Sequence, residues 1–193
     1  MVILSYNEFE RGFRDYFDPN VYKEVVRLTF QQTKNLSSRD PEIQENIRKK
    51  LDSKRKTLKG GLGQRIKIRD IDDDKIEFFE FEKALAVFRQ NYIYFNMFKK
   101  ICKVDESDVN FINKRKFNRE DFHNAKKKLI KWGLDKNELE NEDEAFDECN
   151  IYGGEYVFFP EFANYARKKN LSLTDKELEK LDFKNLDKVY ERF

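Results

Sequence analysis

Ile76-Glu-Phe-Phe-Glu80-Phe81 is one of four copies of a six-residue pattern: an apolar residue, three variable residues, a carboxylate and a Phe. We call this pattern the hexapeptide repeat. Its other copies lie at Leu4–Phe9, Phe117–Phe122 and Val157–Phe162, so the final Phe residues are 72, 41 and 40 positions apart. A period near 40 residues, with one gap of nearly twice that length, indicates tandem supersecondary units.

The hexapeptide repeat is typical of the end of an EF-hand loop. In such a loop an apolar residue at position 8 pairs with the neighbouring loop, and a carboxylate at position 12 binds calcium through both oxygens. The sequence therefore predicts an all-α, EF-hand-like fold of two lobes, each a pair of degenerate helix-loop-helix units with short β pairing between its loops. The predicted divisions are an N-terminal lobe over 1–91, a C-terminal pair over 92–171 and a helical tail over 172–193. The first hand is expected to be truncated, because Met1 falls at loop position 5.

Apolar residues at helical spacing predict the helices that flank these loops. Thr174 and Glu177 form a capping box that predicts a further helix, and the apolar residues of 186–193 are expected to dock on the body of the protein. The other expected helices cover 9–17, 20–34, a charged stretch from about 41 to 58, a long stretch from 81 to 102, 122–132, 139–149 and 162–166.

Most of the calcium ligands of an EF-hand loop, expected at positions 1, 3, 5 and 12, are missing. In the fourth loop, Asn150 to Glu161, only the two end residues are of a ligand type. The third loop, Asn110 to Asp121, places Lys114 and Lys116 at positions 5 and 7, where their charges repel a cation. Neither loop therefore carries the spaced carboxylates that hold calcium.

The second loop begins at Arg69, whereas a register shifted to Asp70–Glu80 recruits further acids. We predict that no residue of the chain forms a metal, cofactor-binding or catalytic site. The alternative is one weak calcium site, either in the fourth loop from Asn150 to Glu161 or in the shifted register from Asp70 to Glu80.

The composition favours a folded, helical protein. Of the 193 residues, 39% are hydrophobic and 39% are charged, and the 19 Phe and 9 Tyr argue against disorder. No apolar run reaches 18 residues, so no transmembrane span is expected. Val2 stands where N-myristoylation requires Gly, so no membrane anchor is expected. Two Cys residues do not make a disulfide framework, which suits a reducing cytosolic compartment.

The net charge of +2 is unevenly distributed. One interpretation is that the charged runs are solvated faces of amphipathic helices; the alternative is a bipolar surface that docks on a charged partner. The acidic run extends from Asp135 to Glu148. The basic clusters are Arg48-Lys49-Lys50, Lys54-Arg55-Lys56, Lys114-Arg115-Lys116 and Lys126-Lys127-Lys128.

The residue types that carry catalysis are few, and each has a simpler interpretation. His123, the single His, follows Phe122 and is interpreted as a surface or packing residue. Cys102 and Cys149 end incoming helices, where small buried hydrophobes are expected. The stretch from Gly60 to Gly63 lacks the Gly-Lys-Ser/Thr of a phosphate-binding loop and fits a helix stop. We therefore predict that the chain is not an enzyme.

Several short motifs occur together between about Leu4 and Leu171. They are Gly61-Leu-Gly63 before the second hexapeptide, Tyr92-Ile-Tyr-Phe95, Lys131-Trp132-Gly133-Leu134, Ala145–Asn150 with Gly153-Gly154, and Phe159-Pro-Glu-Phe162. With these motifs the stretch resembles the flagellar calcium-binding protein (calflagin) family of EF-hand proteins. The resemblance implies a helical protein of two paired EF-hand lobes, located in cilia or flagella. In that family N-terminal acylation attaches the protein to membranes and calcium acts as the switch; this sequence departs from the family on both points.

The resemblance and the degenerate loops together predict a non-enzymatic structural or adaptor protein of the ciliary or flagellar axoneme. The expected partners are tubulin and axonemal proteins, because basic clusters complement the acidic surface of tubulin. Nucleic-acid binding is not expected, since the near-neutral net charge weakens any phosphate-binding surface. The alternative function is a calcium sensor or buffer with a weak site in the fourth loop.

Overall fold

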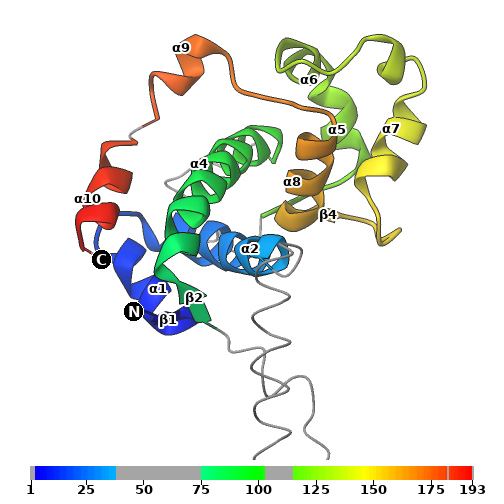
Figure 1. The fold of residues 1–193 in the computed structure, drawn as a ribbon. Helices are drawn as coiled ribbons and strands as arrows, with labels where there is room; N and C mark the ends of the chain where they lie inside the picture. The colour runs from blue at the N-terminus through cyan, green and yellow to red at the C-terminus, as the bar shows by residue number, and fades with distance from the viewer. Residues whose placement is uncertain (1–2, 38–74, 103–114, 182, 193) are drawn as a thin grey trace, which may run out of the picture.

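The computed structural model describes residues 3–37, 75–102, 115–181 and 183–192, and the chain there is mostly helical (Figure 1). Several predictions from the sequence fall on other residues and so lie outside the described part. They are the charged helix to about residue 58, the Gly60–Gly63 stop, the acids of 70–74, the start of the third loop and the basic clusters at 48–50 and 54–56.

The N-terminal half consists of β1 (Ile3–Ser5), α1 (Tyr6–Arg14), α2 (Pro19–Ser37), β2 (Lys75–Glu77) and α4 (Phe78–Ile101). Helix α1 begins where it does because Ser5 and Glu8 form a capping box. Pro19 opens α2, a position that suits its fixed φ. Figure 1 shows α2 and α4 packed across one another at the centre of the molecule.

The C-terminal half begins with β3 (Lys116–Phe117), α5 (Arg119–Asn124) and α6 (Lys126–Lys131). It continues with the short 3₁₀ helix η4 (Asn137–Leu139), α7 (Glu142–Cys149), β4 (Val157–Phe158) and α8 (Phe159–Lys168). Helix α8 packs on α4, so the two halves are in direct contact.

Two expected helices are each divided. The helix expected over 122–132 becomes α5 and α6, which meet at Ala125, where a turn with φ −85° and ψ −2° separates them. The helix expected over 139–149 becomes η4 and α7, because the Asn141 side chain accepts a hydrogen bond from the Glu144 amide and starts α7 anew.

The apolar residues that open the hexapeptide repeats pair with one another, as the sequence predicted. Leu4 of β1 lies opposite Ile76 of β2, and Phe117 of β3 lies opposite Val157 of β4, each in an antiparallel two-stranded sheet. All four side chains are buried. The first copy of the repeat is therefore joined to the second, and the third to the fourth.

Aromatic residues from both halves of the described chain fill the core. In the N-terminal half Phe13 stacks on Phe88, with ring centroids 4.4 Å apart. In the C-terminal half Phe98 contacts both Phe117 and Phe162, at 5.6 and 5.9 Å. Helix α4 supplies residues to both clusters and runs unbroken across the predicted lobe boundary between residues 91 and 92. The lobe division itself stays a prediction.

The C-terminal segment contains α9 (Asp175–Leu178) and α10 (Lys184–Arg192). The predicted Thr174–Glu177 capping box is confirmed, since the Thr174 amide donates to the Glu177 carboxylate at 3.1 Å. Helix α10 packs on α4 and α1 through the buried side chains of Leu186 and Val189, which confirms the predicted docking. The chain thus returns to its own start, and the two termini lie close together in Figure 1.

Candidate functional site

The fourth loop, Asn150 to Glu161, is the one loop of the predicted set that lies wholly within the described residues. It leaves the C-terminal end of α7, where Asn150 is the cap residue. It ends in the first turn of α8, where Glu161 is the third helical residue. At the ligand positions 1, 3, 5 and 12 of this loop, these two residues are the only ones of a ligand type.

Asn150 closes the loop on itself. Its Nδ2 donates to the Gly154 carbonyl at 2.6 Å, and its Oδ1 accepts from the Gly154 amide at 3.2 Å. Its own carbonyl accepts from the Gly153 amide at 3.0 Å. Gly153 has a φ of 64°, a left-handed conformation that glycine adopts without strain. The Asn150 side chain is therefore fully engaged by the loop backbone.

Glu161 is buried, with 3% of its surface exposed, and its two oxygens bind different parts of the loop. Oε2 accepts a hydrogen bond from the Phe158 amide at 2.9 Å, and Oε1 accepts a longer one from the Tyr152 amide at 3.4 Å. A buried carboxylate needs such donors, because burial without a partner costs several kcal/mol. Backbone amides occupy the oxygens that would face calcium in an occupied EF-hand loop.

Three of the four hexapeptide carboxylates have a structural role. Each of these three stands three residues after the helix N-cap and bonds back to the N-cap amide: Glu8 to Ser5 at 2.8 Å, Asp121 to Asn118 at 3.3 Å, and Glu161 to Phe158 at 2.9 Å. Such a bond satisfies one of the free amides at a helix start. This role accounts for the recurrence of the carboxylate without requiring an ion.

The fourth loop exposes three large hydrophobic residues, which we call its apolar face. Ile151, Tyr152 and Phe158 are 54%, 82% and 52% exposed, and with Tyr190 they are the exposed large hydrophobic residues of the described part of the chain. Tyr152 and Phe158 lie near one another, since the Glu161 carboxylate binds the amides of both. Hydrogen bonds thus hold the backbone that carries two of these exposed side chains.

The acidic run from Asp135 to Glu148 is bound largely by cations of the same molecule. Arg119 reaches Asp143 at 2.8 Å and Asp147 at 2.6 Å. Lys126 donates to Glu142 at 2.6 Å and lowers the pKa of that carboxyl. Hydrogen bonds from Lys168 and Lys169 lower the pKa of Glu148. These contacts favour amphipathic helices with internal ion pairs over an acidic docking face.

The basic clusters within the described residues also make internal contacts. Arg115 lies 3.6 Å from Glu24 of α2, and the Lys116 ammonium lies 3.6 Å from the ring centre of Tyr156. Lys128 donates to the carbonyl of Lys100 at 2.7 Å. Lys114, the first residue of the basic cluster at 114–116, lies outside the described part of the chain.

A buried polar junction between the two halves was not predicted from the sequence. Asn91 of α4 is fully buried and donates to Thr29 Oγ1 at 3.1 Å and to Gln32 Oε1 at 2.9 Å, both on α2. Arg167 of α8 donates to Asn91 Oδ1 at 3.0 Å and to Gln32 Oε1 at 2.9 Å. We call these four residues the Asn91 junction. The one sign of this junction in the sequence is Asn91 itself, a polar residue at a core-facing position of the aromatic helix α4.

The residues considered for catalysis are a histidine beside two carboxylates and two cysteines that are shielded by burial. His123 lies between Glu142 and Asp143, at 3.7 and 3.6 Å. Burial, with the charge of Asp121, raises the pKa of the Cys102 thiol to about 12. Burial also raises the pKa of Cys149, which is fully buried. Because the thiolate is the reactive form, both thiols are poor nucleophiles. The prediction that the chain is not an enzyme stays a prediction.

No protein-family model, curated protein or solved structure matches this chain. Across the described residues, no three His, Cys, Asp or Glu side chains are grouped so as to hold a metal ion. Among the helices that the structure describes, none has both the length and the apolar character needed to cross a membrane.

Proposed function

We propose that this chain is an EF-hand-like scaffold, a non-enzymatic structural or adaptor protein of the cilium or flagellum that presents fixed surfaces to axonemal proteins. The observation that carries the proposal is the state of Glu161, whose carboxylate is bound by the Tyr152 and Phe158 amides. In a calcium sensor, ion binding at the loops changes the angle between the helices. Here the bonds of Glu161 hold the start of α8 to the loop without an ion, which supports a constant angle.

The pairing of the loops supports the EF-hand-like assignment. The residues opposite one another, Leu4 with Ile76 and Phe117 with Val157, are those that occupy position 8 when each loop is counted back from its final carboxylate. Each pair is followed by a helix that begins at the hexapeptide repeat. Paired loops followed by helices are what an EF-hand pair requires.

The Asn91 junction supports a rigid scaffold in preference to two lobes that move. Arg167 of α8 binds residues of both α2 and α4, so a rotation of the C-terminal half breaks its hydrogen bonds. The buried Asn91 would then lose partners, and an unsatisfied buried amide costs about 1–3 kcal/mol. A fixed arrangement suits an adaptor, because its binding surfaces keep their spacing.

The apolar face of the fourth loop supports protein binding. Isolated exposed hydrophobic residues are ordinary, whereas several on one loop are typical of contact surfaces. Ile151, Tyr152 and Phe158 form such a group on a loop that its own hydrogen bonds keep in shape. The axonemal location and the tubulin partner come from the family resemblance and from the basic clusters.

Binding to detergent-extracted axonemes tests the proposed function. We expect the full chain to bind equally in calcium and in chelator, and to be released by salt. The double variant Tyr152→Ser/Phe158→Ser should bind less, whereas Asn164→Ser/Lys180→Ser, at exposed positions elsewhere, should bind as the parent does. Absence of binding to axonemes and to microtubules at low salt would reject the adaptor role.

Calorimetry at millimolar calcium separates the scaffold from the alternative, a weak calcium sensor or buffer. The scaffold predicts no binding heat for the parent chain or for Glu161→Gln. A heat that Glu161→Gln abolishes would assign a calcium site to the fourth loop, since Gln cannot supply the bidentate carboxylate. That result would replace the scaffold by the alternative.

A further inference from the structure

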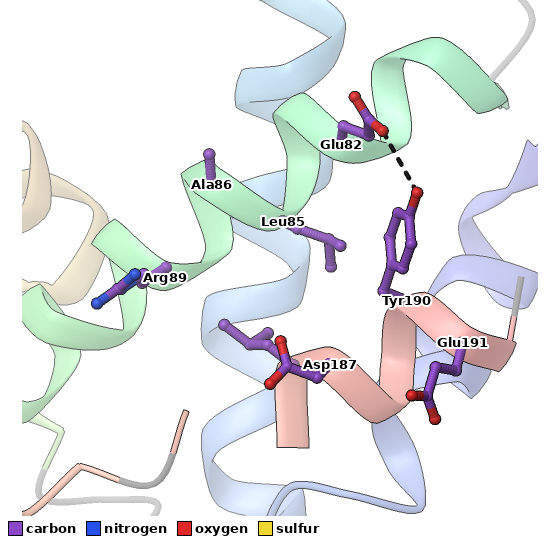
Figure 2. A pocket seen from close by; sticks show the side chains of 8 residues that line it. Glu82, Leu85, Ala86, Arg89, Asp187, Tyr190 and Glu191 are labelled. Carbon is purple, nitrogen blue, oxygen red and sulfur yellow. Dashed lines mark hydrogen bonds between the residues drawn. The ribbon is translucent and has the colours of Figure 1, made fainter. Parts of the chain in front are cut away.

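A groove lies between α4 and α10, and it is separate from the fourth loop (Figure 2). The groove is open to solvent and has a volume of about 460 Å³. Leu85, Ala86 and Leu186 give it an apolar lining. Figure 2 shows Glu82, Leu85, Ala86 and Arg89 along α4 and Asp187, Tyr190 and Glu191 on α10, with Leu85 and Glu82 directed towards Tyr190. Two helices far apart in the sequence thus build one surface.

The rim of the groove carries three carboxylates, those of Glu82, Asp187 and Glu191. Glu82 accepts a hydrogen bond from the Tyr190 hydroxyl at 3.4 Å, drawn in Figure 2. Within the described residues, none of these three carboxylates has an ion-pair partner. The acids of α7 differ in this respect, since Asp143, Asp147 and Glu142 are bound by cations of the same molecule.

The groove has a single basic residue of its own in its lining, Arg89, and this residue is engaged elsewhere. Its guanidinium carbon lies 4.6 Å from the ring centre of Phe183, a typical cation–π distance. The groove therefore combines an apolar lining with an excess of negative charge. Tyr190, which is 45% exposed, adds an accessible aromatic ring at the end of the groove opposite Arg89.

We propose that the groove binds a basic segment of a partner protein through an inserted arginine or lysine side chain. The methylene groups of such a side chain cover Leu85 and Leu186 while its charge reaches the carboxylates of the rim. Arginine fits better than lysine, because its planar guanidinium binds carboxylates with two hydrogen bonds and stacks on an aromatic ring such as Tyr190. The binding weakens with salt, as expected for exposed charges.

This inference extends the proposed adaptor function, because it specifies that one partner carries a basic segment. It rests on that function only for its biological setting. The groove is tested by direct peptide binding to the isolated chain, without axonemes or calcium. A failure of the groove and a failure of the adaptor role therefore give different results.

The test uses two fluorescein-labelled peptides that alternate leucine pairs with either arginine or glutamate pairs, and measures anisotropy against the full chain. We expect the arginine peptide to bind and the glutamate peptide not to bind. The variant Glu82→Gln/Asp187→Asn/Glu191→Gln should bind the arginine peptide at least tenfold more weakly. The control Glu120→Gln/Glu140→Gln/Glu179→Gln removes the same charge from exposed positions outside the groove and should bind as the parent does.

Ala86→Arg is a second test, at an exposed position of α4. Because exposed substitutions usually change stability little, we expect the variant to fold. The added side chain fills the groove and brings its own cation, so we expect the arginine peptide to be excluded. Equal binding of the two peptides to the parent, or equal weakening by the groove variant and the control, would overturn the proposal. Unchanged binding by Ala86→Arg would do the same.

Discussion

Arg167 on α8 donates a hydrogen bond of 3.0 Å to the Asn91 side chain on α4, between residues 76 positions apart. The Asn91 amide in turn donates to Thr29 and Gln32 on α2. One fully buried amide thus joins three helices from both halves of the molecule.

The first prediction concerns this junction. Asn91→Ala removes a buried hydrogen-bonding centre and leaves Thr29, Gln32 and Arg167 without that partner, so we expect a loss of about 2–4 kcal/mol in the free energy of unfolding. Urea denaturation measures it. Asn164→Ala, an exposed Asn on α8, serves as the control and should change stability by less than about 0.5 kcal/mol. Equal effects of the two substitutions would contradict the role of the junction.

The second prediction concerns acid pH. Although burial alone raises the pKa of Glu177, hydrogen bonds from Lys100, Thr174 and Trp132 lower it to about 2, from an ordinary value of 4.5. A carboxyl whose folded-state pKa is lowered stabilises the fold above its unfolded-state pKa. That stability is lost as pH falls from about 4.5 towards 2.

Unfolding measured at pH 6 and at pH 2.5 tests this linkage. We expect the parent chain to lose more stability between these two pH values than Glu177→Gln does, because the variant has no carboxyl to protonate. Glu179→Gln, an exposed neighbour, should follow the parent. Parallel losses in the parent and in Glu177→Gln would show that this residue does not contribute to the acid sensitivity.

The third prediction compares two Phe residues of one strand pair. Phe117 on β3 is fully buried, whereas Phe158 on β4 is 52% exposed. Phe117→Ala leaves a cavity in the aromatic core and should cost about 3–5 kcal/mol, while Phe158→Ala should cost less than about 1 kcal/mol. Thermal and urea unfolding of the two variants decide the matter. A costly Phe158→Ala would mean that the apolar face of the fourth loop serves stability and not contact.

The fourth prediction concerns Gly133, which ends α6 with a φ of 107°. There is room for a side chain, since a methyl group added at this position would lie 4.0 Å from its nearest neighbour, the Asn170 carbonyl oxygen. The conformation is nevertheless strained for any other residue, so Gly133→Ala should cost about 1–3 kcal/mol. Gly154→Ala, with no positive φ and comparable space, is the control and should be milder. A tolerated Gly133→Ala would show that the helix end shifts to relieve the strain.

The sequence predicted those features that depend on local pattern. The hexapeptide repeat predicted the pairing of Leu4 with Ile76, because the apolar residues at position 8 of neighbouring EF-hand loops lie opposite one another. The Thr174–Glu177 capping box could be recognised in the sequence because both of its partners lie within one helical turn. The long helix through Phe81 and Phe95 followed from its apolar spacing.

Features that depend on the packing of distant segments could not be predicted in the same way. Arg167 has the sequence context of an ordinary exposed residue, and its partner Asn91 is identified only when α8 lies on α4. The groove between Leu85 and Leu186 likewise exists only because α10 returns to α4. The capping role of Glu161 was missed for a different reason, since a capping carboxylate and a calcium ligand occupy the same position of the same pattern.

The continuity of helix α4 determines how the two halves of the molecule unfold. It carries Phe88 into one aromatic cluster and Phe98 into the other, ten residues apart on a helix without a break. Melting the segment between them would expose both clusters at once. We therefore expect hydrogen exchange along α4 to be the slowest in the described chain, with a single cooperative unit spanning both halves.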